Sequence, residues 1–371
     1  MEDLQSRGAP LEYWFVKVSC GDLAFLADWI VRRDSGSAEV RISMWVRGTG
    51  RVLRSRSRTW REDGTAVEIC GCTLTARGAT GEVESVRWNL ACLPGPWLLE
   101  PAPVFARLSQ PFDLQLVARP RARFDGTVTV GKETFRIDDA AGTLVHYWGR
   151  RLPHAWLWVS ADGVGEHDAA VEAALFRSRL WGASKPLVAG GYVAVNALGR
   201  TAQIIAPVYG RITAAGNRTA FDVRARTFGQ SIDLTARAPQ ASYNDLGEGI
   251  RQTLLADLTV DGWGSCSGRA GLEIRGGPAH GRAPHTTWQH ELTSMVMVSA
   301  SSTKPSCPAN KSAKSVSRLL SKEPIRRATH PSLPADPHRC SAGTPVSSPF
   351  GVSGPTDQVR AHCRLPCGCH R

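Results

Sequence analysis

The residues best suited to chemistry fall within one short stretch of the chain, residues 138–158. It contains two carboxylic acids, two imidazoles and four large aromatic side chains: Asp138, Asp139, His146, His154, Tyr147, Trp148, Trp156 and Trp158. The whole chain is only 7% aromatic, so this cluster indicates a broad apolar wall. A carboxylic acid beside such a wall can act as a proton donor, because burial raises its pKa. The stretch therefore predicts a site for a hydrophobic small molecule.

Two strands are expected to position these side chains. Thr, Val, Tyr and Trp favour extended structure, so we expect strands at residues 142–148 and 155–160. Side chains alternate along a strand, which places His146 and Trp148 on one face and Trp156 and Trp158 on one face of the next strand. If those faces meet, they line a cavity with one titratable group. A register slip of one residue would reverse every assignment, so the inward face stays open.

Each candidate also has a purely structural interpretation. Asp138 and Asp139 precede Gly142, and such a pair is typical of a turn in which Asp hydrogen-bonds its own backbone. His146 could equally be a hydrogen-bonded strut between sheets. The tryptophans could be ordinary core packing.

The rest of the chain predicts an all-β protein with two successive domains. Short strands recur about every ten residues, and no long amphipathic helix interrupts them. We expect β domains at residues 11–120 and 121–277, then an irregular to disordered basic Ser/Pro-rich tail at residues 278–371. From Ser299 onward there are 11 Lys plus Arg against 3 Asp plus Glu. Such a segment buries too little apolar surface to offset the entropy of ordering it.

Charge and composition limit the function classes. Without that tail the chain has 34 Lys plus Arg against 30 Asp plus Glu, so it lacks the footprint of a nucleic-acid-binding protein. Arg54, Arg56 and Arg58 alternate with serines, which favours a solvated strand face over phosphate binding. Cys70 and Cys72 lie two apart on an expected strand and do not indicate zinc. We expect no metal and no cofactor.

The ends of the chain and its apolar runs bear on location. No apolar run approaches the length of about 18 residues that suggests a transmembrane helix. Residues 1–10 lack the basic start and apolar core of a secretory signal. We therefore expect a cytoplasmic protein with no transmembrane segment and at most a weak membrane-surface contact through the basic tail.

The chain resembles the tandem lipocalin-like family, which includes carotenoid hydratase (hydroxyneurosporene synthase), tocopherol cyclase and AttH-type proteins. The resemblance lies in Asp138-Asp139, Gly142, His146-Tyr147-Trp148-Gly149, Trp156-Leu-Trp158 and the opening Tyr13-Trp14-Phe15. It implies two antiparallel lipocalin-like barrels or half-barrels around a hydrophobic pocket. It also implies catalytic candidates Asp138, Asp139 and His146, and ligand-binding candidates Trp14, Tyr147, Trp148, Trp156 and Trp158.

Two functions follow from that resemblance. One is binding of an isoprenoid, sterol or acyl lipid in a β-barrel pocket. The other is cofactor-independent hydratase, cyclase or isomerase chemistry, in which an acid protonates an isoprenoid-like double bond. Binding is favoured because no set of acids with a clear mechanism stands out, and fold does not imply function. A purely structural module would instead have a filled core and no cavity.

Overall fold

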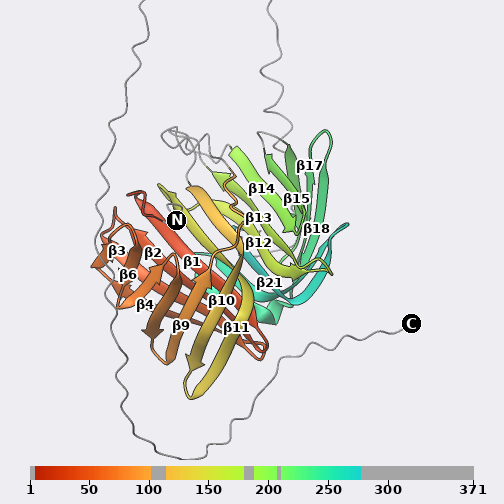
Figure 1. The fold of residues 1–371 in the computed structure, drawn as a ribbon. Coiled ribbons are helices and arrows are strands. Elements are labelled where there is room, and N and C mark those ends of the chain that lie inside the picture. Colours follow the sequence, from red (N-terminus) through yellow and green to blue (C-terminus); the bar gives the residue numbers. More distant parts are fainter. Residues whose placement is uncertain (1–4, 102–113, 179–187, 207–209, 277–371) are drawn as a thin grey trace, which may run out of the picture. The chain divides into compact units, whose positions relative to one another are not determined.

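The computed structural model describes residues 5–101, 114–178, 188–206 and 210–276. All of them belong to the same structural unit, Met1–Ser299. The predicted tail, residues 278–371, lies outside the described residues, and so does its suggested membrane contact. The described residues are almost entirely β-strand, which confirms the all-β prediction (Figure 1). None of the helices among them is long or apolar enough to span a membrane.

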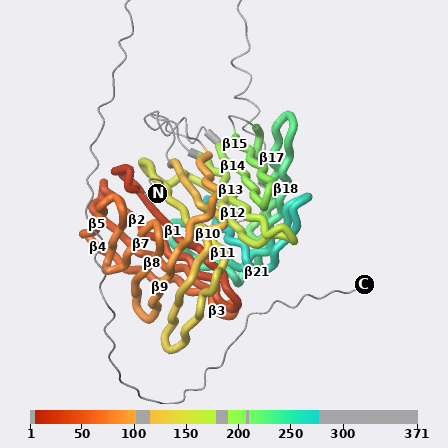
Figure 2. Tube along the Cα trace, viewed as in Figure 1, coloured from red at the N-terminus to blue at the C-terminus, as the bar shows by residue number. Residues whose placement is uncertain are grey.

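The first sheet has eleven antiparallel strands in the order β4-β3-β2-β1-β11-β10-β9-β8-β7-β6-β5. Their bounds are β1 (Leu11–Cys20), β2 (Leu23–Arg32), β3 (Ser37–Val46), β4 (Thr49–Ser57), β5 (Trp60–Glu62), β6 (Ala66–Ile69), β7 (Cys72–Thr75), β8 (Gly78–Val83), β9 (Val86–Leu93), β10 (Leu114–Val130) and β11 (Glu133–Gly149). Neighbouring strands are mostly joined by tight turns, as the red to yellow part of the tube shows (Figure 2). The exception is β1, which pairs with the distant β11.

The second sheet has ten strands in the order β15-β14-β13-β12-β21-β20-β18-β17-β16, with β19 paired to β20. Their bounds are β12 (Ala155–Val164), β13 (Ala169–Ser178), β14 (Val188–Ala197), β15 (Arg200–Ala206), β16 (Arg211–Gly216), β17 (Ala220–Arg226), β18 (Ser231–Arg237), β19 (Asn244–Gly247), β20 (Ile250–Val260) and β21 (Gly264–Arg275). The end strands β15 and β16 approach each other, so the sheet is a nearly closed barrel.

The division between the two sheets differs from the predicted domain boundary. Residues 120 and 121 lie inside β10, which pairs with both β9 and β11 of the first sheet. The sheets instead separate between Gly149 and Ala155. The hairpin at residues 127–137 is visible in the sequence, but its pairing with β9 is a long-range contact that local pattern does not reveal.

Two local predictions also need correction. Residues 134–148 do not form two strands separated by a turn, because β11 runs through them as one strand with irregular register opposite β10. Asp139 takes a positive φ of 45° at this irregularity, and its N–H donates to Asp125. Cys70 and Cys72 do not share a strand: Cys70 lies in the turn between β6 and β7, with φ of 54°.

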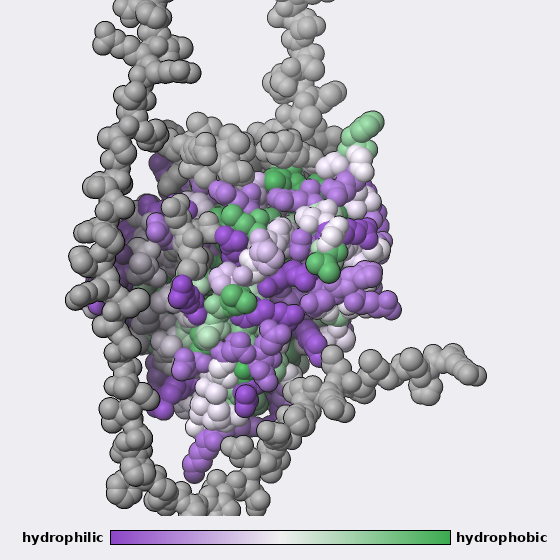
Figure 3. All heavy atoms as spheres, in the orientation of Figure 1, coloured by the Kyte–Doolittle hydropathy of each residue, from purple (hydrophilic) through white to green (hydrophobic). Residues whose placement is uncertain are grey.

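Apolar side chains form three main clusters. The first sheet encloses a core that includes Trp14, Trp29 and Trp88, and the second encloses one that includes Leu157 and Val159. A third cluster combines outward-facing residues of both sheets, among them Phe15, Tyr147, Trp156 and Trp158. Burying each large side chain contributes about 1.5–3 kcal/mol. On the face drawn in Figure 3, hydrophilic side chains predominate, with hydrophobic ones in small patches between them.

Candidate active site

The register of β1 against β11 decides which predicted residues face the contact between the sheets. Trp14 pairs with His146, and Tyr13 pairs with Tyr147. Residues directly opposite in an antiparallel pair share a face, and the next pair along points the other way. Trp14 and His146 therefore face the core of the first sheet, whereas Tyr13 and Tyr147 face the second sheet.

Strand β12 supplies the opposite wall. Trp156 and Trp158 alternate with Leu157 and Val159, which fill the core of the second sheet. The indole of Trp158 meets the ring of Phe15 edge-on, with centroids 5.5 Å apart. Such edge-to-face pairs are a preferred aromatic geometry. The two sheets thus meet through aromatic side chains, and the predicted Trp-x-Trp wall is present.

A cavity of about 60 Å³ lies among these rings. Its wall includes Tyr13, Tyr147, Trp156, Trp158 and Glu273. The rings of Tyr13 and Tyr147 are stacked within it, 4.6 Å apart. A groove of about 490 Å³ shares part of this wall, including Tyr13, Trp156 and Glu273, so the cavity and the groove are adjacent parts of one candidate site.

Glu273 on β21 is the acid that lies in both parts of this site. Its side chain is 8% exposed, and its two oxygens accept hydrogen bonds of 2.7 Å from Trp156 Nε1 and 2.7 Å from Gln252 Nε2. Burial raises the pKa of this carboxyl, and the nearby charges of Arg41 and the two hydrogen bonds oppose that shift. Glu273 therefore remains protonated to a higher pH than an exposed glutamate.

The neighbouring amide of Gln252 is suited to both protonation states of Glu273. Gln252 Oε1 is buried and has no hydrogen-bond partner among the described residues. As placed, the amide donates through Nε2 to a carboxylate. After rotation by half a turn, Oε1 would accept the proton of a carboxylic acid. Gln252 can thus form a hydrogen bond with Glu273 in either protonation state of the carboxyl.

A second carboxyl, Asp28 on β2, reaches the same cavity from the first sheet. It is 2% exposed and accepts a 2.7 Å hydrogen bond from Arg41 Nε. Burial raises the pKa of Asp28, although Arg41 opposes the rise. The charge of Asp28 also helps to raise the pKa of Glu273. The cavity therefore has one acid held by a cation and one acid held by neutral donors.

Beyond Trp158, a further buried polar cluster joins the sheets. Trp158 Nε1 donates to Glu172 at 2.6 Å, and Lys17 Nζ donates to Ser160 Oγ at 3.1 Å. Lys17 also lies 3.5 Å from Asp162. Burial raises the pKa of Glu172 to about 7. This cluster fixes the orientation of Trp158, one wall of the cavity.

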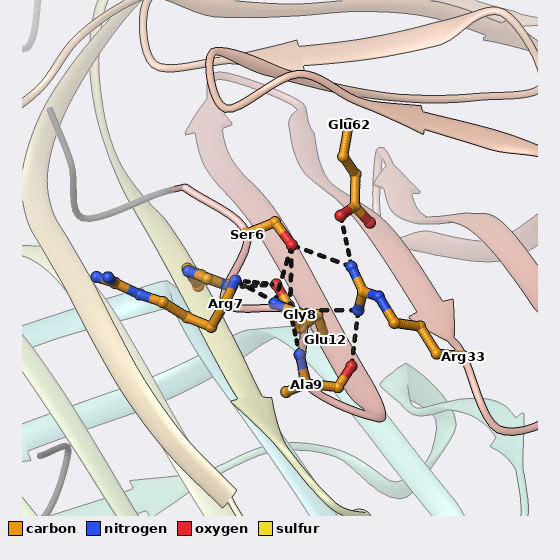
Figure 4. Close-up of polar contacts among 8 residues, drawn as sticks. Ser6, Arg7, Gly8, Ala9, Glu12, Arg33 and Glu62 are labelled. Atoms are coloured by element: carbon orange, nitrogen blue, oxygen red, sulfur yellow. Dashed lines mark hydrogen bonds and ion pairs between the residues drawn. The ribbon is translucent and has the colours of Figure 1, made fainter.

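His146 occupies a different network, on the other face of β11. His146 Nε2 lies 3.2 Å from Glu12 Oε2, both side chains are fully buried, and the imidazole stacks on Trp14 with centroids 4.6 Å apart. Figure 4 shows the backbone of Arg7 and Ala9 directed toward Glu12, with Arg33 joining it to Glu62. The hydrogen bond with His146 and those from the backbone N–H groups of Arg7 and Ala9 lower the pKa of Glu12 despite its burial.

The structure thus separates the predicted site residues. Tyr147, Trp156 and Trp158 line the cavity. His146, Trp14 and Trp148 face away from it, on the opposite side of β1 or β11, so the expected meeting of the His146–Trp148 face with the Trp156–Trp158 face does not occur. Asp138 and Asp139 are exposed, and Asp139 lies 3.7 Å from Arg123. None of these five lines either part of the site.

Two acids that line the cavity, Asp28 and Glu273, were not selected as site residues from the sequence. Each nevertheless stands out from its apolar neighbours there. Asp28 interrupts the apolar run of residues 23–31, and Glu273 stands between Leu272 and Ile274. An ionisable residue in a strand that is buried on both faces needs a partner, or it shifts its pKa. That rule would have selected both residues from the sequence. It would not have predicted that they reach the cavity from opposite sheets.

Comparison with known proteins agrees with this architecture. A crystal structure assigned as AttH from Nitrosomonas europaea matches with a TM-score of 0.51, over 73% of this chain and 94% of that one, at 17% identity. Kievitone hydratase from Nectria haematococca matches with a TM-score of 0.50, over 74% and 91%, at 12% identity. The chain therefore has the tandem lipocalin-like fold that its sequence resembles.

Comparison of sequences finds relatives over a smaller part of the chain than comparison of structures does. Uncharacterized proteins of two Mycobacterium tuberculosis strains are 31% identical to this chain over 107 residues. That match covers 27% of this chain and only 31% of the length of those curated relatives. No family model matches the chain.

Proposed function

We propose that this protein binds a small, largely apolar molecule at the contact between its two sheets. The support is the cavity among Tyr147, Trp156 and Trp158 and the larger groove beside it, with which it shares lining residues. The groove volume of about 490 Å³ lies within the range of about 300–1,000 Å³ typical of small-molecule pockets. The ligand would lie between the barrels, where aromatic side chains of both sheets meet around the cavity.

The sizes of the two spaces constrain the ligand. A cavity of about 60 Å³ corresponds to roughly two water molecules of liquid, at about 30 Å³ each. It can receive the tip of a slender molecule, but not a sterol ring system. The remainder would extend along the groove past Tyr13 and Trp156. An isoprenoid or acyl chain therefore fits this geometry better than a sterol.

Acid catalysis is the second candidate, and the position of Glu273 favours it. A carboxyl with a raised pKa, directed into an aromatic cavity, is suited to protonate a double bond. In hydration, Glu273 would give its proton to one alkene carbon, and the other carbon would become cationic. Water would then form the new C–O bond, and its released proton would return to Glu273. In cyclisation or isomerisation, a proton lost from carbon would return there instead.

The walls are suited to such a cation. The ring faces of Trp156, Trp158 and Tyr147 could each stabilise a nearby positive charge by about 0.5–2 kcal/mol. Gln252 could follow the protonation of Glu273 as described above. This reaction class agrees with the name of the hydratase that shares the fold, but a shared fold at low identity does not carry over an activity.

The test uses the full chain, stripped of lipid and incubated with a lipid extract from its source. Bound and free material are then compared by mass spectrometry for the wild type, Glu273→Gln and the exposed control Glu166→Gln. A retained compound of unchanged structure supports binding alone. An isomer, or a product heavier by one water, that forms with the wild type and the control but not with Glu273→Gln supports catalysis. If the wild type retains nothing, the binding proposal fails.

A further inference from the structure

The groove beside the aromatic cavity is rich in charged side chains. Four arginines and three acids line it: Arg32, Arg41, Arg54, Arg56, Glu39, Glu248 and Glu273. All four arginines lie on β2, β3 and β4 of the first sheet. Glu248 lies in the turn between β19 and β20 of the second sheet, and Glu273 lies on β21. A groove of this composition is poorly suited to a ligand that is apolar along its whole length.

Most of these charges are matched within the protein. Glu39 lies 2.8 Å from Arg56 and 3.4 Å from Arg54. Arg41 pairs with Asp28 at 2.7 Å, and Glu248 pairs with Arg275 at 3.3 Å. Glu273 is held by neutral donors and retains its proton more readily than an exposed glutamate. The local positive charge therefore exceeds the negative charge.

The unmatched cation is Arg32, at the end of β2. Its backbone pairs with Leu11 and Ser37, so its side chain shares the groove face with Ile30. Arg32 is half-buried, and no residue in the described part of the chain pairs with its guanidinium. Close by in the same wall, Arg54 shares the single carboxylate of Glu39 with Arg56, so this pair of arginines also carries net positive charge.

These two groups share a preference for one kind of partner. Guanidinium groups bind carboxylate and phosphate oxygens through paired N–H donors, and partial shielding from water strengthens such bonds. Within the described ranges Arg32 has no carboxylate partner, and Arg54 and Arg56 share one, so an anion supplied by a ligand is favoured there. Neutral alcohols offer a weaker acceptor.

We propose that the site takes an amphiphilic acid, with its apolar end in the aromatic cavity and its anionic head at Arg32 and Arg54. This inference rests on the proposed binding site and specifies its ligand class. Carboxylate and phosphate heads share the required chemistry. The groove separates the head from the apolar end, so the reacting double bond would lie near Glu273 and the anchoring charge away from it.

Three matched isoprenoids test the proposal: geraniol, geranic acid and geranyl phosphate. Their affinities for the full chain are measured by titration calorimetry, at a pH where both acids are ionised. We expect at least one acid to bind at least about tenfold more tightly than geraniol, as a charge-assisted hydrogen bond implies. The better of the two acids identifies the head group.

Variants assign the effect to Arg32. Arg32→Gln should abolish the preference for the acid and leave the affinity for geraniol unchanged. Arg58→Gln is the matched control, because Arg58 is exposed and does not line the groove, and it should retain the preference. Equal binding of acids and alcohol by the wild type, or an unchanged preference in Arg32→Gln, would overturn the inference while leaving the apolar site intact. If none of the three compounds binds, the proposed site itself fails, and the inference fails with it.

Discussion

Replacing Glu172 by Gln should change how the stability of the protein depends on pH. Glu172 is fully buried, accepts a 2.6 Å hydrogen bond from Trp158, and has one buried oxygen with no partner among the described residues. Burial raises its pKa from 4.5 to about 7. Gln has nearly the same shape and can still accept the Trp158 bond through its carbonyl oxygen, so the change removes mainly the titration.

The sign follows from which state holds the proton. Between the two pKa values the folded protein keeps the Glu172 proton and the unfolded chain does not, so stability falls as pH rises. Below pH 4.5 both states are protonated and the contribution is fully present. Each pH unit in this interval corresponds to about 1.4 kcal/mol, so the wild type should lose about 3 kcal/mol relative to Glu172→Gln between pH 4.5 and about 7.

Urea unfolding measured at several pH values provides the assay, with the free energy of unfolding taken from each curve. Glu166→Gln, an exposed residue of the same half of the chain, should follow the wild type throughout. Parallel curves for the wild type and Glu172→Gln across this interval would refute the reasoning. They would mean that Glu172 does not keep its proton when the protein folds.

Further predictions concern the site and the Glu12 network. Rate measurements should show that turnover falls as pH rises through the raised pKa of Glu273. Glu273→Gln should abolish turnover, while calorimetry should show that the ligand still binds. Trp156→Ala should weaken ligand binding about tenfold or more, whereas Trp148→Ala should leave the affinity unchanged in the folded fraction. Glu12→Gln should lower the free energy of unfolding, measured in urea at neutral pH, by about 2–3 kcal/mol. Its difference from the wild type should shrink in acid, because the pKa of Glu12 is lowered in the folded protein. Asp139→Asn should leave turnover and binding as in the wild type, because Asp139 is exposed and lies outside the candidate site. A loss of turnover would mean that Asp139 takes part in catalysis.

The fold followed largely from local pattern. Alternating residues and Gly-centred turns predicted the all-β class and several of the hairpins, because consecutive antiparallel strands are local in sequence. The boundary between the sheets did not follow, since it depends on β1 pairing with β11 and on β10 pairing with β9. Such long-range pairings are fixed by the total packing of the barrel and leave no local signature.

The candidate site was predicted only in part. Tyr147, Trp156 and Trp158 were found because aromatic clustering is visible in the sequence. His146 lies on the other face of β11, and the sequence could not show this, because the period of two predicts which residues share a face but not which face meets the second sheet. Glu273 lies far from that cluster in sequence, and only the contact between the sheets brings it to the aromatic wall.

A crystal structure of the full chain with its retained ligand tests the central claim most directly. We expect electron density for the ligand between the two sheets, bounded by Tyr147, Trp156 and Trp158, with Glu273 in contact with it. Density within the core of either barrel, or at the exposed Asp138–Asp139 bulge, would contradict this assignment of the site.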